Sequence, residues 1–318
     1  MRVLIAGAGA LGSIFGAFLR RAGDDVTLLG RPGHLDAIAA GGLFVEGIWG
    51  DHHVDGFHVA HDAAQLVAGF EAILVTVKAY DTAAVAAAVA ATLRPDGVML
   101  SLQNGLGNAE TLGRVVGPER VLAARVIFGA EVVVPGRVRV TVYADPVLIG
   151  VWPPADPRRV GQAQAWAQRI HAAGIPAEFT EDVAAALWGK VFYNAALNPL
   201  GALLGVHYGA LGEHADSRAI MDRAIEEAFA VALAEGVRLP WASAAAYRAV
   251  FYERLLPVTY HHRSSMLQDL EHGRPTEVDA ISGEVWRRGR RHGVTTPVNE
   301  LLTRLVRARE AVRTGDGR

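Results

Sequence analysis

A single charged residue in an apolar segment is the first candidate for chemistry in this chain. The segment from Val183 to Val206 contains one charge, Lys190. In a helix that turns about 100° per residue, Lys190, Asn194 and Asn198 lie within about 80° of one another, on a face that is otherwise apolar. An ammonium group is costly to bury without a partner. The spacing therefore favours a polar pocket with apolar walls.

Two other interpretations of this segment involve no chemistry. Lys190 can extend from a helix edge into water while the two asparagines bind backbone groups. The segment is also long enough to span a membrane. Its lysine, its asparagines, Pro199 and its glycines argue against a membrane span. We therefore expect no membrane association.

The amino terminus carries a second candidate, a strand followed by a glycine turn and a helix. The apolar run Val3–Ile5 leads into the turn Gly7–Gly12, and Asp24–Gly30 is predicted as the next strand. Glycines at this spacing let backbone N–H groups approach a pyrophosphate, and the helix N-terminus adds positive potential. Two other interpretations are a signal peptide and a glycine turn that binds no ligand. The glycines that interrupt the apolar run argue against the signal peptide, so the turn without a ligand is the alternative that stays open. The residues predicted to line this dinucleotide site are Gly7, Gly9, Ala10, Leu11 and Gly12.

The end of the second strand indicates which dinucleotide binds. NAD sites usually carry an acidic residue about 20 residues after the glycines, where this chain has Gly30 and Arg31. A guanidinium group can bind a 2′-phosphate through two hydrogen bonds, whereas a carboxylate would repel it. Arg31 therefore predicts NADPH as the cofactor. The alternative is an ordinary surface arginine, because Asp36 follows a few residues later.

Composition limits the class of protein. The 318 residues are 51% hydrophobic, which is enough for two domains with their own cores. A net charge of −2 favours neither nucleic acid nor an anionic membrane as a partner. The chain has no cysteine, which excludes thiol catalysis and suits the cytoplasm, and its histidine pairs lack zinc-site spacing. We expect a cytoplasmic protein without a metal, and the oligomeric state stays open, a homodimer included.

Strands and helices alternate in the first half of the chain, as a parallel α/β sheet requires. Ala72–Val77 and Gly97–Leu102 are predicted as buried strands, and Lys78 and Asn104 follow their ends. Ligands bind beyond the carboxyl ends of such strands. Lys78 and Asn104 are therefore candidate site residues, although turn chemistry explains each of them equally well.

The pattern changes twice after the parallel strands. From Val126 it predicts an antiparallel hairpin around Pro135-Gly136, which extends the sheet edge. Thr180–Asp182 resembles a helix cap, and the later chain reads as helical. The predicted helices are 216–236, 241–255, 264–272, 276–292 and 298–312. We predict a Rossmann-type, doubly wound α/β domain over residues 1–180 and an all-helical domain over 181–318.

Ser265 and Glu277 are further polar candidates in the helical half. Each lies in a segment that resembles a capping box, with Ser265 three residues before Gln268 and Thr276 three residues before Asp279. On spacing alone, Ser265 can be a helix cap and Glu277 an acidic residue in the first turn of a helix. Neither residue then needs a catalytic or binding role.

Taken together, these motifs resemble the ketopantoate reductase family, the 2-dehydropantoate 2-reductases, over essentially the whole chain. The resemblance implies NADPH-dependent reduction of 2-dehydropantoate to pantoate, a step of pantothenate and coenzyme A biosynthesis. The motifs that carry it are Gly7–Gly12, Leu102–Asn108, Lys190 with Asn194 and Asn198-Pro199, and Ser264–Asp269 leading to Thr276–Gly283.

The resemblance also implies a role for each candidate residue. Lys190 is the general acid, and Asn104 bridges cofactor and substrate. Lys78 and Arg31 help to hold NADPH. The implied substrate contacts are Asn194, Asn198 and Ser265 on the oxo acid and Glu277 on its hydroxyl group.

The chemistry of the residues agrees with that assignment, but two rival functions stay open. Reduction of a 2-oxo acid requires a hydride and a proton, and a lysine ammonium can donate the proton and stabilise the developing alkoxide. The first rival is an NADPH-dependent reductase or dehydrogenase of another small 2-oxo or hydroxy acid. The second is a non-catalytic dinucleotide sensor, which has no need for a lysine such as Lys190 in a dry pocket.

Overall fold

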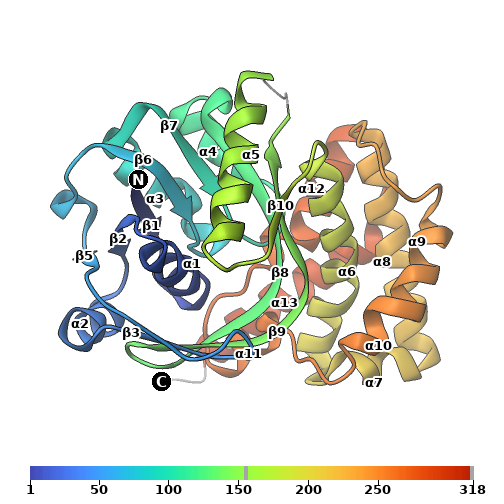
Figure 1. Cartoon of the computed structure of the whole chain (residues 1–318). Coiled ribbons are helices and arrows are strands. Elements are labelled where there is room, and N and C mark those ends of the chain that lie inside the picture. The colour runs from blue at the N-terminus through green and yellow to red at the C-terminus, as the bar shows by residue number, and fades with distance from the viewer. Residues whose placement is uncertain (154–156, 316–318) are drawn as a thin grey trace. The chain divides into compact units, whose positions relative to one another are not determined.

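The computed structural model describes residues 1–153 and 157–315 of the chain, and these form two compact units (Figure 1). The first unit comprises Met1–Asn104 and Asn108–Val183. The second comprises Gly105–Gly107 and Ala184–Arg318.

The first unit is built on a ten-stranded mixed sheet. Its strand order is β4-β3-β9-β8-β7-β6-β1-β2-β5, and β10 pairs with β9 beside this path. The strands are β1 (Arg2–Ala6), β2 (Asp25–Leu29), β3 (Leu43–Gly47), β4 (His52–Val54), β5 (His58–Ala60), β6 (Phe70–Val75), β7 (Leu93–Ser101), β8 (Val121–Val134), β9 (Arg137–Val151) and β10 (Ala177–Phe179). Strands β7, β6, β1 and β2 run parallel to one another.

Helices cover both faces of this sheet, as the doubly wound prediction requires. Val3 and Ile5 of β1 belong to a core that also contains Phe15 of α1 and Trp166 of α5. Leu4 between them is fully buried as well. Because neighbouring strand residues point to opposite faces, the second face is also packed, and α3 and α4 lie against it (Figure 1). The helices are α1 (Ala10–Arg21), α2 (Pro32–Gly41), α3 (Thr82–Val89), α4 (Asn108–Val116) and α5 (Pro157–Ala172). The predicted fold class is confirmed.

The predicted hairpin exists and extends the sheet, but further strands lie beyond it. Strands β8 and β9 are antiparallel around Pro135-Gly136. The hairpin does not end the sheet, because the far side of β9 pairs with β3 over Arg137–Val140 and with β10 over Val147–Ile149. The hairpin extends the parallel sheet beyond β7, as predicted. The sheet continues past it through β3 and β4, strands of only five and three residues that the sequence pattern did not reveal.

All the regular elements of the second unit, among its described residues, are helical. A 3₁₀ turn, η6, precedes α12, and a π turn, η5, follows α9. The elements are α6 (Val183–Leu204), α7 (Tyr208–Glu213), α8 (Ala215–Ala234), α9 (Ala244–Val250), η5 (Phe251–Leu255), α10 (Leu256–Val258), α11 (Ser265–Glu271), η6 (Val278–Ala280), α12 (Ser282–His292) and α13 (Pro297–Gly315). Across the part of the chain that the structure describes, no helix is both long and apolar enough to cross a membrane.

Two helices begin later than their patterns predict. The predicted helix 276–292 is interrupted at Ile281, whose φ of −105° and ψ of −99° are not helical, so α12 begins at Ser282. The predicted helix 241–255 begins only at Ala244, because Ser243 is its N-cap and accepts a hydrogen bond from the backbone N–H of Ala246 at 3.1 Å.

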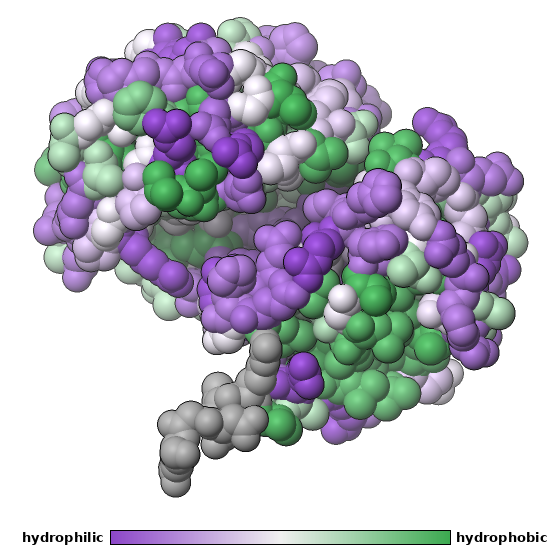
Figure 2. Space-filling view, turned by 90° about the horizontal axis from the view of Figure 1, so that it is seen from below, coloured by the Kyte–Doolittle hydropathy of each residue, from purple (hydrophilic) through white to green (hydrophobic). Residues whose placement is uncertain are grey.

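Some apolar surface of the helical unit stays in contact with solvent. The exposed apolar side chains include Leu204 and Leu233, both 56% exposed, and Val258, 73% exposed. Figure 2 shows apolar residues gathered over the helices of this unit on the face that it displays.

Candidate functional site

The carboxyl ends of four parallel strands lie at the same edge of the sheet in the first unit. Ala6 at the end of β1 is in register with Leu29 at the end of β2 and with Val75 at the end of β6, and Val75 is in register with Ser101 at the end of β7. The residues that follow these four ends are the glycine turn, Gly30-Arg31, Thr76–Lys78 and Leu102–Asn104. The structure therefore brings all the predicted cofactor residues of the first unit to one edge.

The glycine turn is held by backbone bonds that leave no space for side chains at two of its positions. The N–H groups of Gly7 and Ala8 both donate to the carbonyl of Leu29 at 2.9 Å. Gly7 has a φ of +110°, and a Cβ atom there would lie 2.6 Å from the backbone nitrogen of Val77. A Cβ atom on Gly12 would lie 2.6 Å from Oγ1 of Thr76, which also donates to the Gly7 carbonyl at 2.7 Å. Only glycine fits at positions 7 and 12.

The N-terminus of α1 has the features of an anion site. Gly9 precedes the helix, and no side chain of the described residues caps it there. The first turn contains no acidic residue. A Cβ atom on the exposed Gly9 would have no heavy atom within 4 Å. Open space beside uncapped N–H groups fits a pyrophosphate.

Arg31 lies at the start of α2. A half-buried histidine of α2, His34, connects this helix to the helix that follows the glycine turn. Arg31 is exposed and occupies the N-cap position. His34, one turn later, has Nε2 2.9 Å from Oγ of Ser13 in α1, and its Nδ1 accepts the backbone N–H of Gly136 at 3.1 Å. Because Nδ1 accepts, Nε2 carries the proton and donates to Ser13. Burial lowers the pKa of His34. The sequence analysis missed this histidine, whose partners are distant in sequence.

Gln103 connects the segments that carry Lys78 and Asn104. Its side chain is 5% exposed, and Nε2 donates to the carbonyl of Val77 at 2.9 Å and to Oγ1 of Thr82 at 2.7 Å. Val77 precedes Lys78, and Asn104 follows Gln103. One buried amide therefore fixes the main chain beside both candidates.

Asn108 fixes the backbone of Asn104 from the other side. Its Nδ2 donates to the carbonyl of Asn104 at 2.8 Å, and its Oδ1 lies 3.0 Å from Oγ1 of Thr82. Thr82 and Asn108 are the first residues of α3 and α4, and both are buried. Gln103, Thr82 and Asn108 thus form one polar network behind the strand ends. The sequence contained a signal for it, since Gln103 adjoins a candidate and the other two begin helices.

In the second unit, the predicted helix around Lys190 is continuous. Lys190, Asn194 and Asn198 all lie within α6, and the two asparagines are 7% and 5% exposed. Lys190 itself is half-buried. The three polar residues therefore share one helix in a largely buried setting, as the periodicity predicts.

Ser265 is not the cap that its capping-box pattern predicts. The N-cap of α11 is Ser264, whose Oγ accepts the backbone N–H of Leu267 at 3.0 Å, and Ser265 is exposed. Glu277 is 8% exposed and occupies the N-cap position of η6, where it makes no side-chain capping bond. Helix capping therefore explains neither residue.

Apolar packing brings the segments of Ser265 and Glu277 onto α6. A single buried cluster contains Ala195 of α6, Met266 of α11 and Val278 of η6. Met266 directly follows Ser265, and Val278 directly follows Glu277. The five candidate residues of the helical unit therefore come from three elements that pack on one another.

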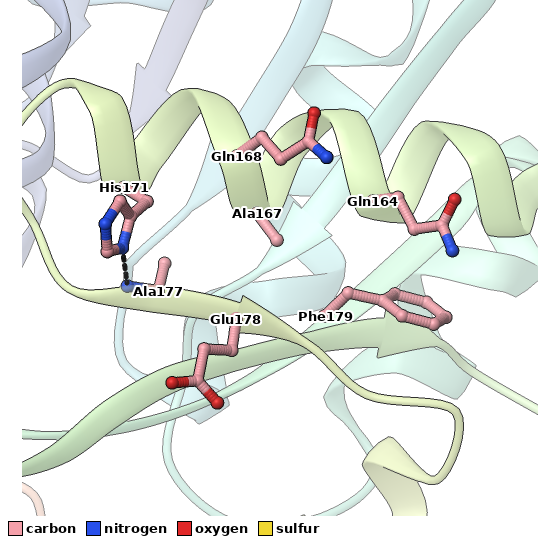
Figure 3. A pocket seen from close by; sticks show the side chains of 7 residues that line it. All are labelled: Gln164, Ala167, Gln168, His171, Ala177, Glu178 and Phe179. Atoms are coloured by element: carbon pink, nitrogen blue, oxygen red, sulfur yellow. Dashed lines mark hydrogen bonds between the residues drawn. The ribbon is translucent and has the colours of Figure 1, made fainter.

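A hollow elsewhere in the first unit lies outside this set of residues. It has a volume of about 620 Å³ and lies between α5 and β10 (Figure 3). Its lining residues are Gln164, Ala167, Gln168, His171, Ala177, Glu178 and Phe179. Within the described part of the chain, no group of three or more His, Cys, Asp or Glu residues could hold a metal ion.

The glycine turn and the three strand ends beside it define the first unit as a dinucleotide-binding α/β fold. Comparison with known proteins identifies the family. The sequence pattern of ketopantoate reductase PanE/ApbA matches residues 3–154, and that of the ketopantoate reductase PanE/ApbA C terminal matches residues 182–310. The chain belongs to the ketopantoate reductase family.

Individual relatives resemble the chain over its whole length. It is 38% identical to the 2-dehydropantoate 2-reductase of Aquifex aeolicus, over 98% of this chain and 97% of that protein. The crystal structure of a PanE/ApbA family ketopantoate reductase from Ralstonia eutropha JMP134 matches with a TM-score of 0.87 and 36% identity, over 99% of this chain and 100% of the other. D-mandelate dehydrogenase, in a ternary structure with NADH and anilino(oxo)acetate, matches with a TM-score of 0.88 and 25% identity, over 98% and 99% of the two chains.

Proposed function

We propose that this protein reduces 2-dehydropantoate to pantoate with NADPH, a step of pantothenate and coenzyme A biosynthesis. The observation that carries the proposal is the placement of Lys190 with two buried asparagines on α6, in a chain of the ketopantoate reductase family. A sensor of dinucleotides would need neither the lysine nor the asparagines. The cytoplasm is the compartment that we propose, and a homodimer stays a prediction that sedimentation equilibrium checks.

The first unit supplies the cofactor site in this proposal, and we assign that role to residues 1–180. The N–H groups at the start of α1 receive the pyrophosphate, and Arg31 pairs with the 2′-phosphate. Lys78 adds a second cation at the same sheet edge. The bound dihydronicotinamide supplies the hydride. The turn residues assigned to this site are Gly7, Gly9, Ala10, Leu11 and Gly12.

Residues 181–318 supply the acid and the substrate contacts. Lys190 donates a proton to the oxo oxygen as negative charge develops there. Asn194, Asn198 and Ser265 hold the oxo acid, and Glu277 accepts a hydrogen bond from its hydroxyl group. Asn104, at the end of β7, contacts both the cofactor and the substrate.

A second candidate function is supported by one comparison. D-mandelate dehydrogenase is as similar in fold as the ketopantoate reductases, and its structure contains NADH rather than NADPH. An oxidoreductase of another 2-hydroxy or 2-oxo acid therefore remains the rival activity. It predicts a preference for an aromatic oxo acid and for NADH.

Steady-state kinetics with two cofactors and three oxo acids separate these functions. NADPH or NADH oxidation is followed with ketopantoate, 2-oxoisovalerate and phenylglyoxylate. We expect the highest kcat/KM for ketopantoate with NADPH. A higher value for phenylglyoxylate with NADH would establish the second candidate. Tight NADPH binding without turnover of any of the three acids would contradict the proposed reduction of ketopantoate and the preference of the second candidate for an aromatic oxo acid.

A further inference from the structure

A tyrosine outside the predicted site determines how Asn198 presents its side chain. The O–H group of Tyr208, the first residue of α7, donates to Oδ1 of Asn198 at 2.6 Å. The two side chains are 3% and 5% exposed. A short hydrogen bond between two buried groups holds the amide in one orientation.

The surroundings of Tyr208 keep its hydroxyl group a donor. Burial raises the pKa of Tyr208 well above its ordinary value, so the phenol stays protonated. Its backbone N–H donates to the carbonyl of His262 at 3.0 Å. Its ring meets the ring of Tyr193 edge-on, with centroids 5.7 Å apart. Backbone and ring are therefore both fixed where the hydroxyl meets Asn198.

The hydrogen bond from Tyr208 to Oδ1 determines which polar group of Asn198 can bind a ligand. A primary amide has an oxygen that accepts and a nitrogen that donates two hydrogen bonds. Since Oδ1 already accepts from Tyr208, Nδ2 is the atom with donors for a ligand. The opposite orientation would present a carbonyl oxygen, which repels a carboxylate or an oxo group. Carbons 1 and 2 of a 2-oxo acid present only acceptor oxygens.

We propose that Tyr208 is a positioning residue for substrate recognition. It orients the Asn198 amide so that Nδ2 donates to an acceptor oxygen of the 2-oxo acid. The inference rests on the proposed function, in which Asn198 contacts the substrate.

Tyr208→Phe removes the hydroxyl group and keeps the ring. We expect the KM for ketopantoate to rise about 3- to 10-fold, as for the loss of one hydrogen bond, with the KM for NADPH unchanged. Tyr247→Phe is the matched control. Tyr247 is equally buried, and its O–H group donates to the carbonyl of Gly189 on the same helix at 2.9 Å. This control should leave both KM values at their native level.

A double-mutant cycle shows whether Tyr208 acts through Asn198. In the Asn198→Ala background, Tyr208→Phe should change the KM for ketopantoate by less than about 2-fold, because the group it orients is gone. The inference would be overturned if the effects of the two substitutions on the KM for ketopantoate were additive. It would also be overturned if Asn198→Ala raised that KM while Tyr208→Phe left it unchanged. An unchanged KM in Asn198→Ala would instead contradict the proposed role of Asn198 itself.

Asn198→Asp tests the same point if Tyr208→Phe does not fold. The carboxylate still accepts the hydrogen bond from Tyr208 but has no donor for the substrate. We expect the KM for ketopantoate to rise at least as much as in Asn198→Ala. A native KM in Asn198→Asp would overturn the inference.

Discussion

In the first unit the candidate residues follow the ends of adjacent strands, whereas in the second they come from three elements far apart in the sequence. Backbone bonds and the Gln103 network hold the first group. Apolar packing of α6, α11 and η6, with the bond from Tyr208 to Asn198, holds the second. A sheet edge positions main chain, which suits a cofactor that is held by N–H groups. Packed helices position side chains, which suits a proton donor and substrate contacts.

This comparison predicts that changes in the helical unit affect chemistry and leave cofactor binding intact. Lys190→Ala should lower kcat by about 10²- to 10⁴-fold, as for the loss of a positioned general acid. The Kd of NADPH, measured by fluorescence titration, should stay near the native value. An equal loss of cofactor affinity would show that the two groups of residues do not have separate roles, and near-native turnover would exclude Lys190 as the acid.

Glu277 should control which oxo acid is preferred. A buried acceptor for a hydroxyl group disfavours analogues that lack one, so the native enzyme should favour ketopantoate over 2-oxoisovalerate by on the order of 10²-fold or more in kcat/KM. Glu277→Ala should narrow that ratio mainly by losing ketopantoate activity. Glu271→Ala, an exposed acid on α11, is the control. If Glu277→Ala kept the native ratio of kcat/KM for ketopantoate over 2-oxoisovalerate, Glu277 would have a structural role only.

In the first unit, Arg31→Ala should act on the cofactor alone. The Kd of NADPH should rise about 10- to 100-fold, as for the loss of charge-assisted hydrogen bonds, while NADH binding changes little. Arg21→Ala, which removes another exposed arginine at the end of α1, provides the control. Equal weakening of both cofactors would contradict the assignment of Arg31 to the 2′-phosphate.

Two buried threonines, one inside the Gln103 network and one outside it, form a matched pair for testing the network. Thr82 and Thr92 are both buried, and each hydroxyl donates to the carbonyl three residues earlier, at 2.9 Å and 2.7 Å. Only Thr82 also accepts from Gln103. Thr82→Val should raise the KM for NADPH by about 3- to 10-fold, whereas Thr92→Val should lower stability without changing that KM. If the KM for NADPH were the same in Thr82→Val and Thr92→Val, the network would have no part in cofactor binding.

The smallest effect that we predict is a pH dependence of stability from His34. Its pKa is lowered by burial, so the unfolded chain binds this proton more readily than the folded one. The contribution to stability is complete above the ordinary value of 6.5 and is lost as the pH falls through the lowered pKa. In His34→Gln the melting temperature should therefore fall less steeply below pH 6.5. If the melting temperature of His34→Gln depended on pH as steeply as that of the native protein, the assignment of this effect to His34 would be contradicted.

Much of the fold and of the candidate site follows from local patterns. The continuous apolar runs of β1 and β6 and the glycine spacing after β1 predict strand ends and a tight turn, because burial on both faces and missing Cβ atoms are properties of single segments. The helical period predicts that Lys190, Asn194 and Asn198 share one side of α6. The short strands β3, β4 and β5 were missed because three to five residues carry too little pattern.

Contacts between distant segments could not be predicted in this way. The backbone N–H of Gly136 donates to His34, 102 residues away in the sequence. Tyr208 lies ten residues from Asn198, on another helix. The break at Ile281, between η6 and α12, was not predicted, because the apolar periodicity of the segment runs through it.

The sequence by itself determined the class of fold, the glycine turn and the side of α6 that carries polar groups, because periodicity and backbone freedom are local. The tertiary structure alone decided that Gln103 joins the ends of β6 and β7, that Ser264 rather than Ser265 caps α11, and that Tyr208 orients Asn198. Those outcomes depend on which side chains meet once the elements pack. Hydrogen-bond partners of buried groups are chosen by that packing and not by spacing along the chain.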